Sequence, residues 1–384
     1  MPHSHAADRP PPTRRHFLQI LATAIGGAAT APTFAAVLDG PSDLHQRPVG
    51  RLKLGVVLPG FGPSGCYTAS WLNGLQLAFD DWANIELSIE QGGGRISQVL
   101  AGVLRLGKQE PDIIVGATTP HNIPQVAQAL ERRSTIFFNV EPGGHIAHAA
   151  ASHANVFHHS LHLWQANYAA GAQAACRFGT RGWMISSFRE AGYDTASAFA
   201  LGFASAGGQV LQQAVSHVPG RTHNPRSLIA KALSARTDFI YINASGAEAQ
   251  ELLALTPQAV LASPMARFAG AGNSTFAAAY QKFNGRKPDA YALLGFEAGN
   301  LIRVATQATD RSGESLSKTL QTAAFEGPRG LVQMDIGTRS TRARAFVDHS
   351  AAVIPDLEPT EEDIMLAHPD WQNAVSGWSV PYAG

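Results

Sequence analysis

Short apolar runs alternate with longer amphipathic stretches along most of the chain. Residues 52–58 (LKLGVVL) are typical of a buried parallel strand, and the spacing of Leu72, Leu75 and Phe79 predicts a helix over residues 67–82. The same unit repeats, with strands expected at residues 85–89, 112–115 and 135–138 and helices at 96–106 and 126–132. Strands that alternate with helices in this way predict a parallel sheet with helices on both faces.

A second array of the same kind follows. Its strands are expected at residues 182–186, 209–215, 238–242 and 259–261, and its helices at 164–177, 193–206, 225–234 and 247–255. Helices at 274–283 and 289–309 and strands at 330–335 and 344–347 are expected to return toward a hinge. The pattern predicts an α/β protein of two doubly wound lobes, with residues 51–155 and part of 270–330 in the N-terminal lobe. Residues 156–270 and part of 331–350 are assigned to the C-terminal lobe, and residues 351–384 to a surface tail.

The first 36 residues have the composition of an export signal. Arg14 and Arg15 precede an uncharged segment, residues 17–34, which ends before the small residues Ala35 and Ala36. These parts predict a twin-arginine signal peptide cleaved near Ala36, so that the twin-arginine translocase delivers the mature chain to the periplasm. A membrane anchor is the alternative, but the Ala, Gly and Thr content makes the segment only weakly hydrophobic.

Charge and cysteine content narrow the classes of function. Lys plus Arg and Asp plus Glu are equal at 29 each, and only 15% of the residues are charged. Such a chain has no basic field to attract nucleic acid. The two cysteines, Cys66 and Cys176, lie in neither a redox nor a zinc spacing. A bridge between them remains an alternative, but two buried free thiols are expected.

The expected topology also predicts where a ligand binds. In open parallel sheets, ligands lie beyond the carboxyl ends of the strands, near the starts of the following helices. With two lobes facing each other, the interlobe cleft is the expected site. The candidate loops are residues 60–67, which include Phe61, and residues 117–122, 139–144, 187–193, 243–246 and 262–267.

One motif in these loops supports a different function. Gly60, Gly62 and Gly65 form a Gly-x-Gly-x-x-Gly turn after a strand, the context in which a dinucleotide pyrophosphate is bound. A twin-arginine-exported NAD(P)-dependent oxidoreductase is therefore an alternative. Pro63 counts against it because proline lacks the N–H that the turn would donate to phosphate. The cluster Gly92-Gly93-Gly94 lacks the Lys-Ser or Lys-Thr of a P-loop, and a tight turn is expected there.

Several segments together resemble branched-chain amino-acid type solute-binding proteins of ABC importers. They occur in order over residues 52–347: Gly74-x-x-Leu77-Ala78, Asp112-Ile113-Ile114-Val115-Gly116, Gly202-Phe203, Lys287-Pro288-Asp289-Ala290-Tyr291 and Gly327-Pro328-Arg329-Gly330. The resemblance implies a type I periplasmic-binding fold of two Rossmann-like lobes. It also implies capture of a small-molecule ligand by hinge closure, delivery to an ABC permease in the inner membrane, and no enzymatic activity or cofactor.

The resemblance also implies which side chains contact the ligand. Tyr67 and Tyr193 match aromatic residues of the cleft wall. The loops that hold a ligand carboxylate in this family contain Thr118, Thr119 and Asn122, and then Glu141. In the second lobe the matching loops contain Asn243, Ser245 and Met265, with no acid for a ligand ammonium. Because Glu141 would repel a carboxylate, an ordinary α-amino acid is not expected; a neutral amide, an aromatic or apolar solute and a cation remain open, as does a structural role for Glu141.

Histidines are concentrated between the two arrays, from His145 to His162. Such a cluster could bind Zn²⁺ or Cu²⁺, so a periplasmic metal- or cofactor-binding protein is a further alternative, although no recognised ligand spacing is present. A neutral hydrogen-bonding role at the cleft floor is expected for His158 or His159. The spacing of Ser, Cys, His and acidic residues assigns no catalytic residue.

Overall fold

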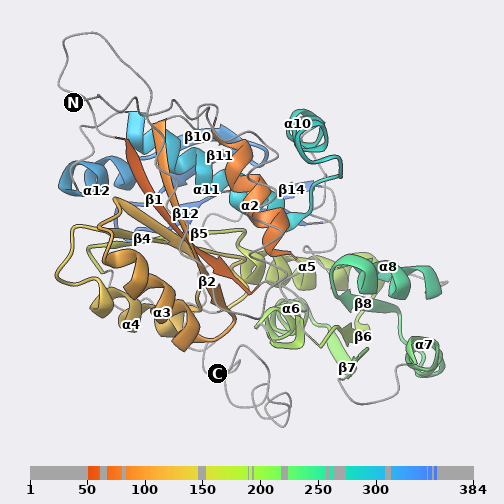
Figure 1. Cartoon of the computed structure of the whole chain (residues 1–384). Helices are drawn as coiled ribbons and strands as arrows, with labels where there is room; N and C mark the ends of the chain where they lie inside the picture. The colour runs from red at the N-terminus through yellow and green to blue at the C-terminus, as the bar shows by residue number, and fades with distance from the viewer. Residues whose placement is uncertain are drawn as a thin grey trace, which may run out of the picture.

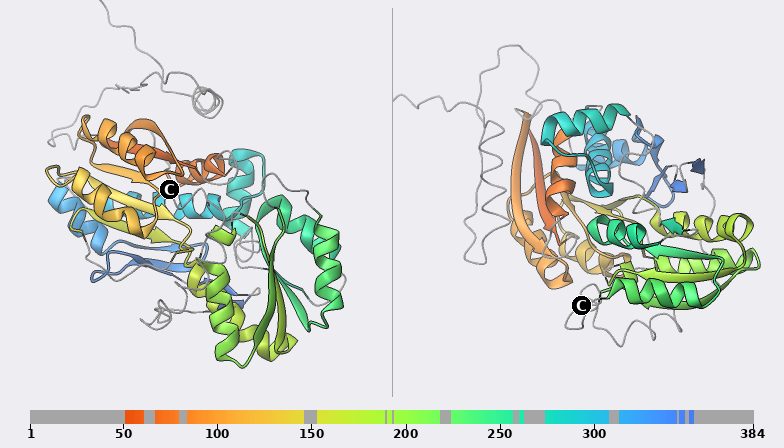
Figure 2. Two further views of the ribbon diagram at one scale, coloured as in Figure 1. Left: turned by 90° about the horizontal axis from the view of Figure 1, so that it is seen from below. Right: turned by 90° about the vertical axis from the view of Figure 1, so that its right-hand side faces the viewer.

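The computed structural model describes residues 51–60, 67–79, 84–145, 153–188, 190–192, 194–217, 224–256, 260–262, 274–307, 313–343, 345–347 and 350–352. The expected signal peptide and tail lie outside these residues. Two bodies of sheet and helix lie next to each other (Figures 1 and 2).

The first lobe is built on a five-stranded parallel sheet of order β2-β1-β3-β4-β5. The strands are β1 (Leu52–Pro59), β2 (Ile85–Gly93), β3 (Ile113–Gly116), β4 (Ile136–Glu141) and β5 (Val156–Ser160). Successive residues face opposite sides: Leu54 and Val56 pack in one buried cluster, whereas Val57 packs in another.

Helices cover both faces of this sheet (Figure 1). The helices α2 (Thr68–Leu77) and α11 (Ala290–Gln307) cover one face, with α10 (Ser274–Asn284) and α12 (Gly313–Gln321) beside them. The helices α3 (Ile96–Gly107) and α4 (Ile123–Ala129) cover the other face. This lobe therefore has the three-layer arrangement that the sequence predicts.

The second lobe repeats the plan with the order β7-β6-β8-β9. Its strands are β6 (Arg181–Ser186), β7 (Gln209–Val215), β8 (Phe239–Asn243) and β9 (Val260–Ala262). Its helices are α5 (Leu163–Phe178), α6 (Thr195–Ser205), α7 (Pro225–Ser234) and α8 (Gly246–Leu255). On β8, Phe239 and Tyr241 pack toward α5 and α6, whereas Ile240 and Ile242 pack toward α7 and α8.

In each lobe, two helices lie in close contact because each has a glycine where the backbone of the other approaches. A Cβ built on Gly74 of α2 would lie 1.9 Å from the carbonyl oxygen of Ala292 on α11, and one on Gly295 of α11 would lie 1.9 Å from that of Trp71 on α2. In the second lobe, a Cβ built on Gly171 of α5 would lie 2.1 Å from the carbonyl oxygen of Phe199 on α6. One built on Gly202 of α6 would lie 1.9 Å from the carbonyl oxygen of Tyr168 on α5. Side chains larger than hydrogen are therefore excluded at equivalent places in the two lobes.

The chain returns to the first lobe before it ends. A small antiparallel sheet consists of β10 (Ala324–Gly327), β11 (Gly330–Met334) and β12 (Thr341–Arg342). Val332 and Met334 pack in the core of the first lobe. The last described strands are β13 (Ala345–Val347) and β14 (Ser350–Ala352), and β13 lies against α5 of the second lobe.

Several element boundaries differ from those expected. The strand β5 pairs with β4, so the chain leaves the first lobe after Ser160 rather than at residue 156. Of residues 331–350, assigned in part to the second lobe, residues 331–342 pack with the first lobe, where the backbone N–H of His158 donates to Arg339, while β13 contacts the second lobe. The α2 helix ends at Leu77, and Gly92 and Gly93 belong to strand β2 instead of forming a turn.

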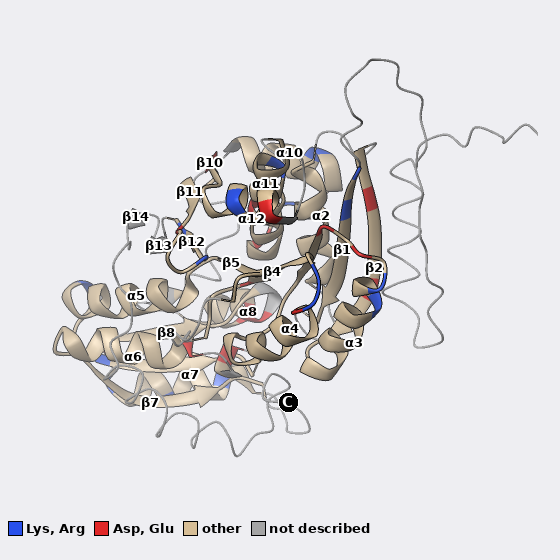
Figure 3. Cartoon of the chain, turned by 90° about the vertical axis from the view of Figure 1, so that its left-hand side faces the viewer, with Lys and Arg blue, Asp and Glu red and all other residues tan. Residues whose placement is uncertain are grey.

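The described residues also bear on the expectations about charge, membrane-spanning helices and cysteines. Lys and Arg are interspersed with Asp and Glu over both lobes in the view of Figure 3. Among the described helices, none is long and apolar enough to cross a membrane. Cys176 is a free, exposed thiol on α5, so its expected burial is wrong, while Cys66 lies outside the described residues.

Candidate functional site

A pocket lies at the carboxyl ends of strands β1 to β4 of the first lobe, where ligands of parallel sheets bind. The space among its lining atoms is about 420 Å³ when the part that is open to solvent is included, and only a small part of it is enclosed. Its lining consists of residues from four strand ends, the helix α3 and the short 3₁₀ helix η3 (Pro120–Asn122). The lining residues are Pro59, Gly60, Gly93, Gly94, Val99, Ala117, Thr118, Thr119, Asn122, Glu141, Pro142 and His145.

One wall of the pocket is made of backbone. A Cβ built on Gly60 would lie 2.6 Å from the amide nitrogen of Gly94, and Gly93 has φ of +146°. Only glycine fits where the ends of β1 and β2 approach so closely. The first glycine of the Gly-x-Gly-x-x-Gly turn therefore has a packing role here, while residues 61–66 of that turn lie outside the described residues.

Hydroxyl and amide groups form the next part of the lining. The side-chain oxygen of Asn139 accepts a hydrogen bond from the backbone N–H of Thr118 at 2.8 Å. The amide of Asn122 donates to the hydroxyl oxygen of Thr119 at 3.0 Å. The structure thus brings Thr118, Thr119 and Asn122 together in the lining, and Asn139 on β4 fixes the backbone of Thr118.

Glu141 supplies the acidic group of the pocket. Burial raises the pKa of its carboxyl, while His145 and the backbone N–H groups of Gly143 and Gly144 lower it to a smaller extent. The carboxyl is therefore harder to ionise than an exposed glutamate. Its loop holds the group at the pocket wall through the two glycine N–H bonds.

The loop that carries Glu141 also contacts the second lobe. The Nδ1 atom of His145 lies 3.6 Å from Oδ2 of Asp194, which directly precedes α6. The backbone N–H of Asp194 donates to the carbonyl of Gly144 at 2.9 Å. The pocket wall is thereby connected to both lobes.

The strand ends of the second lobe carry a polar cluster of their own. Asn243 donates to the hydroxyls of Ser186 at 3.3 Å and Thr195 at 3.4 Å. Ser245 donates to Oε1 of Glu190 at 2.7 Å, and Glu190 is only 1% exposed. Asn243 and Ser245 therefore lie in the expected region, in contact with side chains of their own lobe.

Glu190 is an acidic residue at these strand ends that the sequence analysis did not name. It lies in the 3₁₀ helix η4 (Glu190–Gly192), within a loop that the topology already singled out. The loops that contain Asn243, Ser245 and Met265 hold no acid of their own, but the loop after β6 places Glu190 against Ser245 in the loop after β8. Its position in a candidate loop was the signal in the sequence, whereas its burial depends on contacts between loops that are far apart in sequence.

Tyr67 occupies a different position from the residues above. Its half-buried ring stacks on Tyr291 of α11, with 4.8 Å between ring centroids and an angle of 11°. It is not among the residues that line the pocket. Phe61, Tyr193 and Met265 lie outside the described residues, so their assignment to the site stays a prediction.

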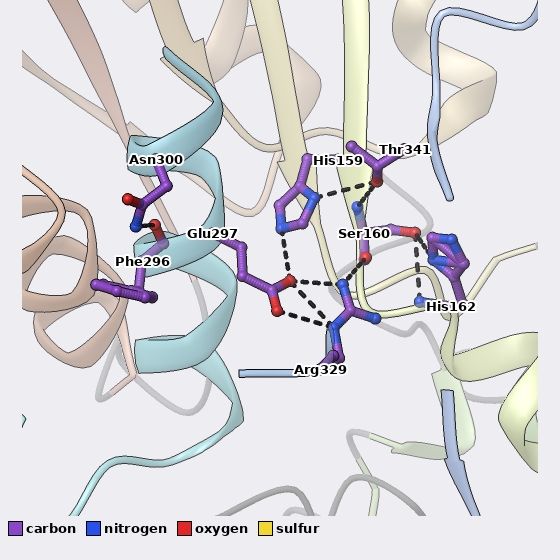
Figure 4. A network of polar contacts seen from close by, with 8 residues as sticks. All are labelled: His159, Ser160, His162, Phe296, Glu297, Asn300, Arg329 and Thr341. Carbon is purple, nitrogen blue, oxygen red and sulfur yellow. Dashed lines mark hydrogen bonds and ion pairs between the residues drawn. The ribbon is translucent and has the colours of Figure 1, made fainter. Parts of the chain in front are cut away.

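His159 is buried in a network away from the pocket lining (Figure 4). Its Nε2 atom lies 3.4 Å from Glu297 of α11, and its Nδ1 atom lies 3.1 Å from the hydroxyl of Thr341. Arg329 donates to both carboxylate oxygens of Glu297, from Nε at 3.0 and 3.1 Å, and to the carbonyl of Ser160 at 3.0 Å. Both ring nitrogens of His159 thus face protein groups.

The charges of this network follow from its contacts. Burial lowers the pKa of His159, so its ring is neutral. The ionised carboxylate of Glu297 can only accept, so the Nε2 atom that faces it carries the ring proton, and Nδ1 is then the acceptor toward the Thr341 hydroxyl. Although burial opposes ionisation, Arg329 and His159 hold the pKa of Glu297 at about 2. A neutral histidine therefore joins an Arg–Glu ion pair to the strands β5 and β12.

The other described histidines of the segment point to different partners. His158 lies 3.4 Å from the Asn139 amide, and His162 lies 3.0 Å from the Ser160 hydroxyl. Burial lowers the pKa of His158 to about 4 and that of His162 to about 3. Within the described part of the chain, no group of three or more His, Cys, Asp or Glu side chains is arranged to hold a metal ion.

Comparison with solved structures gives relatives of the same fold. An ABC transporter substrate-binding protein from Sphaerobacter thermophilus has a TM-score of 0.62 and 21% identity, over 80% of this chain and 97% of that chain. A solute-binding protein of an ABC transporter from R. palustris, in complex with benzoate, has a TM-score of 0.58 and 16% identity, over 80% and 96%. An ABC transporter substrate-binding protein from Desulfitobacterium hafniense, in complex with Leu, has a TM-score of 0.54 and 16% identity, over 79% and 100%.

Sequence comparison supplies the family. No curated protein matches the chain significantly. The sequence profile of the periplasmic binding proteins matches residues 51–272, which include the pocket lining and both parallel sheets. The chain belongs to the periplasmic binding protein family.

Proposed function

We propose that this protein is the solute receptor of an ABC importer, which captures a small molecule between its lobes and delivers it to a permease in the inner membrane. The observation that carries the proposal is the pocket at the strand ends of the first lobe, whose wall also contacts the second lobe through His145 and Asp194. A site held by two bodies can close around a solute, and the relatives above are substrate-binding proteins of ABC transporters.

The described connections between the lobes fit hinge motion. The chain crosses at residues 161–162, between β9 and α10, and again between β12 and β13. His162 has the left-handed conformation, φ 56° and ψ 42°, directly before α5. All three crossings lie outside the parallel strands, so movement at them would leave the pairing within both sheets unchanged.

The proposed site consists of Thr118, Thr119, Asn122 and Glu141, with Glu190, Asn243 and Ser245 on the second lobe. Phe61, Tyr67, Tyr193 and Met265 remain candidates for the cleft wall. His159 is left out, because its ring nitrogens face Glu297 and Thr341.

The proposed function also includes export of the protein to the periplasm. A twin-arginine signal ending near Ala36 would carry the folded chain to the periplasm, where binding proteins of importers work. The family match favours solute binding over the nucleotide-dependent oxidoreductase that the turn at residues 60–65 suggests. No step of bond chemistry is assigned to the pocket.

The test is a binding screen on the mature chain. Amino acids, amides, aromatic solutes and polyols are screened by thermal shift, because a ligand that binds the folded state raises Tm. Small-angle scattering on any hit should show a more compact protein. Thr119→Val and Asn122→Ala should weaken binding about 2- to 10-fold, which corresponds to one hydrogen bond each.

The matched control is Thr256→Val. Thr256 bonds to the carbonyl of Leu252 at the end of α8 and is not a lining residue, so its loss should leave affinity unchanged. If no solute raises Tm, or if the control and the pocket variants change affinity equally, the proposal is refuted.

A further inference from the structure

The lining of the pocket is acidic and rich in hydrogen-bond acceptors. Its charged side chain is Glu141, and none of its described lining residues is Lys or Arg. On the second lobe, the described residues of the facing loops add Glu190, and Asp194 follows them; Arg189 and Arg267 of these loops lie outside the described residues. A carboxylate that entered beside Glu141 would meet like charge, with His145 as the neighbouring group that can carry a positive charge.

Several donors of the pocket are engaged by the protein itself. The N–H of Thr118 is bonded to Asn139, and one amide hydrogen of Asn122 is bonded to Thr119. The N–H groups of Gly143 and Gly144 are bonded to Glu141 itself. Glu141 is the acidic acceptor among the described lining residues, beside the hydroxyl of Thr119 and the remaining amide hydrogen of Asn122.

The position of Glu141 is fixed before any ligand arrives. Its carboxyl is bonded to its own loop by the two glycine N–H groups, and that loop is joined to α6 through Gly144 and Asp194. A carboxyl has about four acceptor positions, so two backbone bonds leave room for further N–H donors. A side chain held in this way is preorganised for recognition and loses little entropy on binding.

Resting on the solute-binding function proposed above, we infer that Glu141 receives an N–H donor group of the ligand, as found in amides, ureas, amidines and amines, and that the pocket rejects carboxylates. The group lies against the Glu141 carboxyl and beside the Thr119 and Asn122 side chains. Specificity then comes from two sources: acceptors that match N–H groups and negative charge that repels anions.

The raised pKa of Glu141 fits this assignment. Burial disfavours the ionised carboxyl more than His145 and the backbone N–H groups favour it, and an arriving amidinium or ammonium adds positive charge. A neutral amide instead needs only a hydrogen bond. Removing the charge of Glu141 while keeping its shape therefore separates the two ligand types.

The experiment uses matched probes of one shape and different chemistry. Benzamide, benzamidine and benzoate form one set, and acetamide, acetamidine and acetate form a smaller one. Each probe is titrated into the mature wild-type chain, Glu141→Gln and the control Glu131→Gln, which changes an exposed glutamate after α4. Binding is measured by calorimetry and thermal shift.

The expected results differ between amides, amidines and carboxylates. Wild type should bind the amide or the amidine of at least one set, and neither carboxylate. Glu141→Gln should weaken amidine binding at least 10-fold, weaken amide binding much less and reduce the discrimination against benzoate. Glu131→Gln should behave as wild type. Glu141→Asp, which keeps the charge, should keep the preference for amidine over benzoate even if Glu141→Gln is poorly folded.

Two results would overturn the inference. One is binding of benzoate, acetate or leucine with no response to any amide or amidine; this leaves the receptor function intact but removes the ligand class. The other is amidine binding that Glu141→Gln does not change. Failure of every solute in the broader screen would instead refute the receptor function itself.

Discussion

Glu297 beneath the hinge is fully buried and Glu141 in the pocket is partly exposed, and their pKa values shift in opposite directions. Arg329 and His159 lower the pKa of Glu297 to about 2, whereas Glu141 has only backbone N–H groups and His145, and desolvation raises its pKa. The carboxylate of Glu297, with its arginine partner, has a structural role. The carboxyl of Glu141 is kept in an environment that disfavours its ionised form, which is typical of functional sites.

Breaking the ion pair should give the largest effect. Arg329→Met leaves the Glu297 carboxylate buried without its cation, and we expect the free energy of unfolding to fall by about 3–5 kcal/mol. Urea denaturation measures the change. The double variant Arg329→Met/Glu297→Leu should recover part of the loss.

An exposed ion pair of the same kind is the control. Arg342 and Asp335 lie 3.2 Å apart, and the arginine side chain is 43% exposed. Arg342→Met should cost less than about 1 kcal/mol. An equal cost for both arginine variants would contradict the structural role assigned to the buried pair.

Acid titration should reveal how much the Glu297 ion pair contributes to the free energy of unfolding. Because its folded pKa lies near 2, below the ordinary value of 4.5, its contribution to stability is complete above pH 4.5 and is lost as the pH falls toward 2. The slope for this one group is at most about 1.4 kcal/mol per pH unit. Glu297→Gln should remove this part of the pH dependence, and an unchanged acid limb of the stability curve would refute the assignment.

The smallest effect on stability should come from Glu141, and its sign should be opposite to that of Glu297. The folded pKa of Glu141 is raised, so at neutral pH its ionisation destabilises the folded chain, and the penalty disappears as the pH falls below that pKa. Glu141→Gln mimics the protonated form and should raise Tm at pH 7 but not at pH 4. A lower Tm at pH 7 would place Glu141 with Glu297 as a structural residue.

The fold was largely predictable from local patterns. The spacing of apolar residues predicts α7 at residues 225–234 and the strands of both sheets other than β5, because each sheet is covered on both faces. The strand β5 was not predicted, since its residues His158 and His159 read as polar. The groups that face the ring nitrogens of His159 are Glu297 and Thr341, both more than a hundred residues away in sequence.

The site was predictable as a set of loops but not as a set of contacts. The rule for parallel sheets placed Thr118, Thr119, Asn122 and Glu141 at strand ends, and the structure gathers these four in one pocket. The contact of Glu190 with Ser245 joins two loops of the second lobe, and the contact of His145 with Asp194 joins the two lobes. Such pairings depend on the relative placement of elements, which the local sequence does not contain.

The route of the chain through the two lobes sets the order in which they can fold during synthesis. The first lobe needs both Leu54 and Val332 in one core, so it stays incomplete until nearly the whole polypeptide has left the ribosome. The cores of the second lobe use only residues between Ala166 and Leu255. The lobe made later is therefore the first that can finish folding, and the nascent N-terminal segment must remain soluble until its partners near the C-terminus emerge.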